Sequence, residues 1–223
     1  MAVDQSQIFR EGEGDNWFRR NAEHLSADGR DDVVLRAIER AVQSGTTLQS
    51  VCELGCSNGW RLAALSGLYP AIGRLAGCDV SEQAIADGQS RWPQLELAVG
   101  PIEDPTMDGQ YDAVIVSYVL HWVARQNLSR AIASIDSRVK EGGILIVSDF
   151  LPDRPAARWY HHREDVRLFT YKQDYAAAFL GLGIYERIDN VIFSHGGMDG
   201  EIAAQDRAQC SVLRKTFETY VTA

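Results

Sequence analysis

The chain has 223 residues, 45% of them hydrophobic and 24% charged, and its 22 Lys and Arg against 31 Asp and Glu give a formal net charge of −9. This length predicts one domain with a sizeable core, and the ordinary composition excludes disordered, collagen-like and disulfide-scaffold proteins. The acidic balance disfavours a nucleic-acid partner, because phosphate binding needs clustered Lys and Arg. The longest nearly apolar run, 113–123, is too short to span a bilayer. We therefore expect a small-molecule partner, with no nucleic acid and no membrane.

The N-terminus and the cysteines indicate a compartment. The first six residues lack the basic and apolar regions of a signal peptide. The four cysteines form no CxxC motif and have no metal-ligand spacing with histidine. We expect free thiols, no metal site and a cytoplasmic location.

The first third of the chain predicts an arm and a helix. Residues 8–18 mix polar and aromatic side chains, and the following helix is capped by Asp31 and Asp32 and ended by Gly45. From Ser50 onward, short apolar runs alternate with helical patterns. The predicted strands are 50–54, 74–80, 95–99, 112–117 and 144–148, and the predicted helices between them are 58–68, 82–90 and 128–139.

This alternation predicts an α/β fold with a doubly wound, mostly parallel sheet covered by helices on both faces. The segment 151–187 breaks the rhythm and is dense in aromatic residues, so we interpret it as a lid on the sheet. Two closing strands, 191–194 and 209–214, follow it. The prediction is a single domain made of an N-terminal helical arm (1–45), a ligand-binding core (48–150), the lid (151–187) and a closing segment (188–223).

The most informative motif is Glu53-Leu54-Gly55-Cys56-Ser57-Asn58-Gly59, which ends a predicted strand and opens a helix. Glycines at such a turn let the backbone approach a ligand closely. Twenty residues beyond Gly59, Asp79 ends the next predicted strand. A carboxylate at that point can accept hydrogen bonds from the ribose hydroxyls of an adenosine-type cofactor.

Two common nucleotide loops are excluded by spacing. A dinucleotide loop needs glycine at its first, third and sixth positions, but counting from Gly55 the third is Ser57 and the sixth is Trp60. A P-loop is excluded because no Gly-Lys-Ser/Thr follows.

The motif resembles motif I of class I S-adenosylmethionine-dependent methyltransferases, an acid followed by Gly-x-Gly-x-Gly, with Ser57 in place of the middle glycine. The resemblance continues over about residues 48–150 and implies a Rossmann-like seven-stranded sheet whose last strand is antiparallel. It implies S-adenosyl-L-methionine as cofactor, and cofactor contacts by loop and strand-end residues. Those residues are Glu53, Gly55, Cys56, Ser57, Gly59, Asp79, Val80, Pro101, Ile102, Glu103 and Ser117.

The arm segment 14–21 is similar to the opening of small methyltransferases of saccharide and natural-product biosynthesis. In that interpretation the arm covers the cofactor, with Trp17 and Asn21 lining it. The alternative is that Trp17 and Phe18 only anchor an N-terminal helix in apolar surroundings.

The sequence restricts the type of methyl transfer more closely than it restricts the identity of the acceptor. No Asn-Pro-Pro-Tyr-type loop and no metal-binding acid follow the fourth predicted strand. What remains is metal-independent methyl transfer to an O or N atom of a small molecule, and the resemblance of the arm implies a place in saccharide or secondary-metabolite biosynthesis. A hydroxyl acceptor needs a general base. The candidate catalytic residues are His162 and Tyr171 in the lid and His121 after the fourth strand, although His121 also suits a structural or cofactor-lining role and His162 an exposed loop.

Two other functions stay open. An NAD(P)-dependent oxidoreductase shares this sheet, although the glycine spacing and the missing Tyr-x-x-x-Lys pair disfavour it. A catalytically silent module that binds S-adenosylmethionine would keep the same cofactor residues.

Overall fold

The computed structural model describes residues 5–25, 32–160, 162–163, 166–195, 202–204 and 206–218. The predicted cap Asp31 lies outside these residues, whereas its neighbour Asp32 caps the first long helix by accepting a hydrogen bond from the backbone N–H of Leu35.

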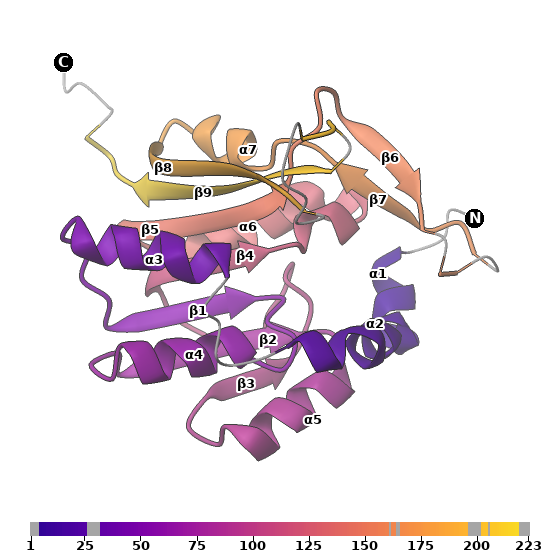
Figure 1. Cartoon of the computed structure of the whole chain (residues 1–223), viewed down its shortest axis with the longest axis horizontal. Helices are drawn as coiled ribbons and strands as arrows, with labels where there is room; N and C mark the ends of the chain where they lie inside the picture. Colours follow the sequence, from indigo (N-terminus) through magenta and orange to yellow (C-terminus); the bar gives the residue numbers. More distant parts are fainter. Residues whose placement is uncertain are drawn as a thin grey trace.

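Seven strands form one sheet in the order β3-β2-β1-β4-β5-β9-β8 (Figure 1). Six strands run parallel, and β9 lies antiparallel between β5 and β8. The predicted fold class, including the antiparallel last strand, is confirmed. The strands are β1 (Ser50–Leu54), β2 (Arg74–Asp79), β3 (Glu96–Val99), β4 (Tyr111–Ser117), β5 (Val139–Phe150), β8 (Tyr185–Ser194) and β9 (Arg207–Lys215).

Helices cover both faces of this sheet, since its central strands are apolar on both sides. Alternate residues of β4 face opposite layers: Ala113 and Ile115 pack with α3 (Val33–Gln43), α4 (Trp60–Leu68) and α5 (Glu82–Arg91). Val114 and Val116 pack with α6 (Leu128–Arg138) and α7 (Ala176–Leu180). The two cores hold the strand ends in a fixed plane, from which the loops of the site project.

The predicted lid is smaller than 151–187. Its first part is an antiparallel hairpin of β6 (Ala156–Trp159) and β7 (Phe169–Lys172). Its second part belongs to the domain core, because α7 buries Phe179 with the preceding Tyr175, and β8 already begins at Tyr185. The aromatic content that suggested a lid thus has two sources, a surface hairpin and a core helix.

The N-terminal arm is a series of short helices. It consists of α1 (Gln5–Ile8), the π-helical turn η1 (Phe9–Glu13), α2 (Gly14–Asn21) and the 3₁₀ turn η2 (Ala22–His24). Gly12, with φ of 146°, interrupts the helical backbone inside η1. Figure 1 shows α1 and α2 at the same end of the molecule as the β6–β7 hairpin. Within the described residues, no helix is long and apolar enough to cross a membrane.

Candidate functional site

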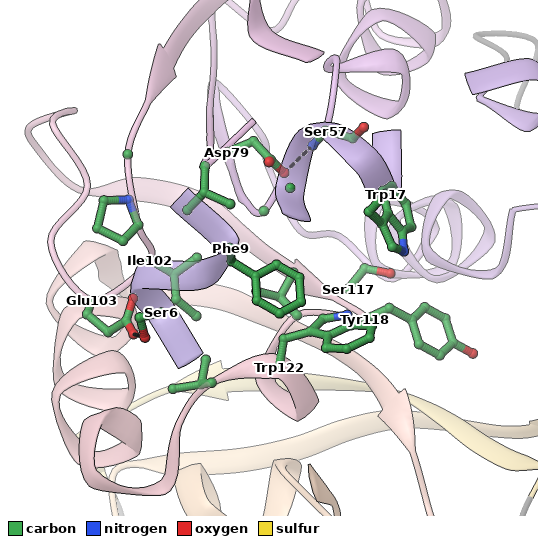
Figure 2. A pocket seen from close by; sticks show the side chains of 17 residues that line it. Ser6, Phe9, Trp17, Ser57, Asp79, Ile102, Glu103, Ser117, Tyr118 and Trp122 are labelled. Atoms are coloured by element: carbon green, nitrogen blue, oxygen red, sulfur yellow. Dashed lines mark hydrogen bonds between the residues drawn. The ribbon is translucent and has the colours of Figure 1, made fainter. Parts of the chain in front are cut away.

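A pocket lies at the carboxyl ends of β1, β2 and β4, under the N-terminal arm (Figure 2). Its walls come from four segments: the loop after β1 and the end of β2, the loop after β3, the turn after β4, and the arm. They supply, in that order, Gly55, Ser57, Asp79 and Val80; Gly100, Pro101, Ile102 and Glu103; Ser117, Tyr118, Val119, Trp122 and Val123; and Ser6, Phe9, Gly14 and Trp17.

The glycine loop leaves room that a side chain would fill. Gly55 has φ of +78°, and a Cβ atom there would lie 2.2 Å from Cγ2 of Val119. Ser57, in the position of the family's middle glycine, also adopts a left-handed backbone with φ of 52°. Its buried Oγ has no hydrogen-bond partner among the described residues. A ligand with a polar group near Ser57 would supply that partner, so the loop fits a bound cofactor.

Asp79 is held in place by the backbone around it. One carboxylate oxygen accepts from the Ser57 N–H at 2.8 Å, and the other accepts from the Ser81 N–H at 2.9 Å. Burial raises the pKa of Asp79, and these backbone hydrogen bonds act in the opposite direction. Each oxygen keeps acceptor capacity for a ligand hydroxyl, as the sequence predicts for this position.

Glu53 lies behind the pocket wall rather than on it. Its carboxylate pairs with Arg61, which also pairs with Asp32 at the start of α3 at 3.0 Å. Burial raises the pKa of Glu53 to about 7, against the lowering effect of Arg61. Glu53 thus ties β1 to α4 and α3 through one oxygen, while its buried Oε2 has no hydrogen-bond partner among the described residues, so its contact with the cofactor stays a prediction. The sequence signal for this tie was Arg61, the second residue of α4, two positions after Gly59.

Three other predicted cofactor residues also lie outside the pocket lining. Cys56 is buried against Gly77 of β2, because a Cβ at Gly77 would lie 2.7 Å from its Sγ. Gly59 caps α4 in a left-handed conformation, with Leu97 close to the position of its missing side chain. Asn21 donates to the carbonyl of Trp17 at 2.8 Å. Of the two predicted arm residues, Trp17 lines the pocket and Asn21 stabilises its helix.

The arm is fastened to the hairpin by a buried carboxylate. Glu13 is fully buried, accepts a hydrogen bond from the Tyr160 hydroxyl at 2.9 Å and pairs with Arg20 at 2.6 Å. Arg163 approaches the same carboxylate at 3.8 Å. We call these four residues, Glu13, Arg20, Tyr160 and Arg163, the clasp. The Tyr160 hydroxyl is therefore engaged in this contact between the arm and the hairpin.

Two further contacts dock the arm. The Gln5 side chain donates to the carbonyls of Trp122 at 2.6 Å and Phe169 at 2.8 Å, which joins the arm to both the β4 turn and β7. Asp15 accepts from the Ser81 hydroxyl at 2.6 Å and the Gln83 N–H at 3.1 Å, at the start of α5. The arm therefore closes the pocket through contacts on three sides.

The two predicted catalytic residues of the lid do not reach the pocket. His162 is exposed, with its ring 5.2 Å from that of Tyr160. Tyr171 lies under the guanidinium of Arg125, 4.4 Å from its ring centroid, and its carbonyl accepts from the Tyr175 hydroxyl. Neither side chain is among the residues that line this pocket, and their contact with an acceptor stays a prediction.

His121, unlike His162 and Tyr171, lies directly beside residues that line the pocket. It is buried in the 3₁₀ turn η3 (Leu120–Trp122), and its Nδ1 lies 2.9 Å from the carboxylate of Asp149 near the end of β5. Asp149 was not among the predicted site residues; its sequence signal was an acid at the end of an otherwise apolar strand. The predicted set also omitted most of the arm and β4-turn residues in the lining, among them Phe9 and Trp122.

The formal charges of the pocket are all negative. Asp79 and Glu103 are acidic, and the lining residues that the structure describes include no Lys, Arg or His. Figure 2 shows the rings of Phe9, Trp17 and Trp122 around the same space. Carboxylates and aromatic faces attract a cationic ligand and disfavour a pyrophosphate. No cluster of three or more His, Cys, Asp or Glu that could hold a metal ion occurs in the described part of the chain.

Comparison with known proteins finds methyltransferases both among family models and among solved structures. Residues 52–147 match a protein-family model described as a methyltransferase domain. Among solved structures, the chain is similar to 1,6-didemethyltoxoflavin-N1-methyltransferase of Burkholderia thailandensis, crystallised with 1,6-didemethyltoxoflavin and S-adenosylhomocysteine. The TM-score is 0.68 at 13% identity, over 97% of this chain and 92% of that one.

Two further structures share the fold. The N-methyltransferase NodS of Bradyrhizobium japonicum, with S-adenosylhomocysteine, gives a TM-score of 0.53 at 18% identity, over 84% of this chain and 90% of that one. An S-adenosylmethionine-dependent methyltransferase of Clostridium acetobutylicum gives 0.58 at 13% identity, over 81% and 89%. No curated protein matches the chain by sequence.

Proposed function

We propose that this chain, whose residues 52–147 carry a methyltransferase domain on a Rossmann-like methyltransferase fold, transfers a methyl group from S-adenosyl-L-methionine to an O or N atom of a small molecule. The transfer is metal-independent, and the acceptor belongs to saccharide or secondary-metabolite biosynthesis. The four cysteines are buried and free, which supports a cytoplasmic location.

The observation that carries this proposal is the charge of the pocket. Its charged lining residues, within the described chain, are the carboxylates Asp79 and Glu103. A dinucleotide would bring a pyrophosphate, for which this lining offers no cationic side chain. S-adenosylmethionine carries a sulfonium and an ammonium group, which carboxylates and aromatic rings attract.

The chain's own residues hold the adenosyl part and exclude water. Asp79 is oriented by the N–H groups of Ser57 and Ser81 to accept from ribose hydroxyls. Ile102, Glu103, Phe9 and Trp17 line the same pocket, and we expect the first two to contact the adenine and the two arm residues to shield the cofactor. When bound, S-adenosylmethionine supplies a methyl group on a sulfonium centre, and alignment of the acceptor with that methyl provides most of the catalysis.

Two experiments test the proposal. Calorimetric titration of the full chain with S-adenosylhomocysteine and, separately, with NADH is expected to show binding of the first alone. Incubation with methyl-labelled S-adenosylmethionine and a cell metabolite extract is expected to give a labelled small molecule. Binding of NADH instead would favour an oxidoreductase, and S-adenosylhomocysteine binding without any labelled product would favour a silent binding module.

A further inference from the structure

A buried histidine–carboxylate pair lies at the carboxyl ends of β4 and β5. Asp149 accepts three hydrogen bonds: from Nδ1 of His121 at 2.9 Å, from the His121 backbone N–H at 3.3 Å, and from the Phe150 N–H at 2.8 Å. Both side chains are almost fully buried, with 5% of His121 and 2% of Asp149 exposed. A carboxylate held in this way fixes the ring and favours the tautomer with its proton on Nδ1, which leaves the lone pair on Nε2.

This pair borders the pocket. The His121 ring lies 4.8 Å from that of Trp122 and 6.2 Å from that of Tyr118, and both of these residues line the pocket. The His121 ring also packs edge-on against that of Phe150, with centroids 5.1 Å apart. His121 therefore stands between two lining aromatics, at the edge of the sheet where β4 ends and the ligand of a doubly wound sheet binds.

Charged groups from several elements face the pair. His195, after β8, lies with its ring 4.7 Å from Tyr118, and burial together with Lys172 and His121 lowers its pKa. The Lys172 ammonium, from β7, lies 3.5 Å from the centroid of the Phe150 ring. Asp149 is the carboxylate in hydrogen-bond contact with His121, and Asp206 interacts with His195 from further away.

We propose that His121, oriented by Asp149, is the general base of the reaction and that the acceptor is a conjugated ring carrying a weakly acidic O–H or N–H group. This proposal rests on the methyltransferase function proposed above. The acceptor proton passes to Nε2 of His121 while the acceptor atom forms its bond to the methyl carbon. The carbon–sulfur bond breaks with its electron pair on sulfur, and the histidinium then releases the proton to solvent.

The proposed acceptor class follows from two features of the site, the base His121 and the aromatic side chains of the pocket wall. A weakly acidic O–H or N–H becomes a strong nucleophile only as it loses its proton, so a positioned base accelerates its reaction. The rings of Tyr118 and Trp122 offer flat surfaces for a planar acceptor. In this arrangement Asp149 is a positioning residue, and His121 lies just behind the lining, where the acceptor reaches its Nε2 between the rings of Tyr118 and Trp122.

The first test needs no acceptor. Imidazole nitrogen NMR of the ¹⁵N-labelled full chain, recorded across neutral pH, reports which ring nitrogen carries the proton. The wild type is expected to show His121 with its proton on Nδ1, Asp149→Asn to lose this preference, and Asp149→Glu to restore part of it. His24, which is exposed in the arm, is the reference within the same spectra. A wild-type His121 protonated on Nε2 would overturn the proposal, since the lone pair would then face Asp149.

The second test uses 4-nitrophenol as a probe with the chain saturated with S-adenosylhomocysteine. The phenolate absorbs in the visible range, so its absorbance measures proton transfer from the bound probe. The pKa of bound 4-nitrophenol is expected to be lower in the wild type than in His121→Gln by about one unit, a tenfold change in ionisation. His24→Gln is the matched control and should behave as wild type.

Three outcomes contradict the proposal. An equal ionised fraction in wild type and His121→Gln removes His121 as the base, and absence of 4-nitrophenol binding removes the acceptor class. Equal binding and no ionisation of the probe in either protein leaves the pair a structural support for the η3 turn. Failure of S-adenosylhomocysteine to bind is measured first and separately, so it identifies a failure of the proposed function itself.

Discussion

Two regions enclose the pocket, and they are built in different ways. The cradle, residues 53–81, comes from neighbouring segments of chain: the N–H groups of Gly55 and Cys56 donate to the carbonyl of Cys78 at 2.8 and 2.9 Å. The cover consists of the arm 5–25 and the hairpin of β6 and β7. Its main link, from Glu13 to Tyr160, joins residues 147 positions apart in the sequence.

This difference predicts different responses to change. The cradle is continuous with the parallel sheet and its two cores, so it should be as stable as the domain itself. The cover is held by a few polar side chains, and some of its residues line the pocket, so we expect the arm to influence how a cofactor enters and leaves. Damage to the cradle should remove affinity, whereas damage to the cover should change mainly the rates of binding and release.

The largest expected effect comes from Gly55→Val in the cradle. The new side chain would meet Val119 and would have to adopt a φ of +78°, so we expect loss of measurable S-adenosylhomocysteine binding and a lower unfolding temperature. Gly55→Ala combined with Val119→Ala separates the two causes, because it relieves the contact and keeps the backbone strain. Calorimetry and thermal unfolding measure both; normal binding by a folded Gly55→Val protein would refute the loop assignment.

The next effect is Asp79→Ala, which removes the predicted acceptor of the ribose hydroxyls. We expect the free energy of S-adenosylhomocysteine binding to fall by ~1.5–3 kcal/mol, as for lost hydrogen bonds to a charged group. Asp104→Ala is the matched control, because that carboxylate is 77% exposed and pairs with Arg130 at 3.5 Å. Unchanged affinity in Asp79→Ala would show that the end of β2 does not hold the ribose.

A smaller effect is expected in the cover, from Glu13→Gln and Tyr160→Phe. Each variant weakens the clasp, and we expect faster release of S-adenosylhomocysteine with a coupling free energy of ~0.5–3 kcal/mol between the two changes. Stopped-flow tryptophan fluorescence measures this, since Trp17 and Trp122 line the pocket. Additive effects of the two changes would mean that Glu13 and Tyr160 do not act together to close the arm.

The smallest effects should come from His162→Gln and Tyr171→Phe. Both side chains lie away from the pocket, so stability and S-adenosylhomocysteine affinity should change by no more than ~0.5 kcal/mol. A tenfold or larger fall in product formation by either variant, with cofactor affinity unchanged, would support the prediction from sequence that these residues contact the acceptor.

The same division decides what the sequence could predict. The cradle was predictable because its signals are local: an apolar run ending in Leu54, the glycine loop, and an acid at the end of the next strand. The cap of α5 is equally local: Ser81, directly before the helix, accepts from the N–H of Ala84. Such features depend on residues within one turn or one strand of each other.

The cover and the His121–Asp149 pair depend on residues that are distant in the sequence. Nothing near Glu13 indicates that its carboxylate is buried against Tyr160, and His121 meets Asp149 only because β4 and β5 are adjacent in the sheet. The core position of α7 was missed for a related reason. Phe179 and Tyr175 have the same composition signal in a core helix as in a lid, and only the packing against α6 distinguishes them.

Amide hydrogen exchange of the full chain, with and without S-adenosylhomocysteine and with NADH as the comparison, tests the central claim most directly. We predict that S-adenosylhomocysteine protects both the cradle amides, those of Ser57 and Ser81 among them, and the arm from Gln5 to Asn21, and that NADH protects neither. Protection of the cradle alone would contradict closure by the arm. Protection by NADH, or none by S-adenosylhomocysteine, would contradict the assignment of this pocket to S-adenosylmethionine.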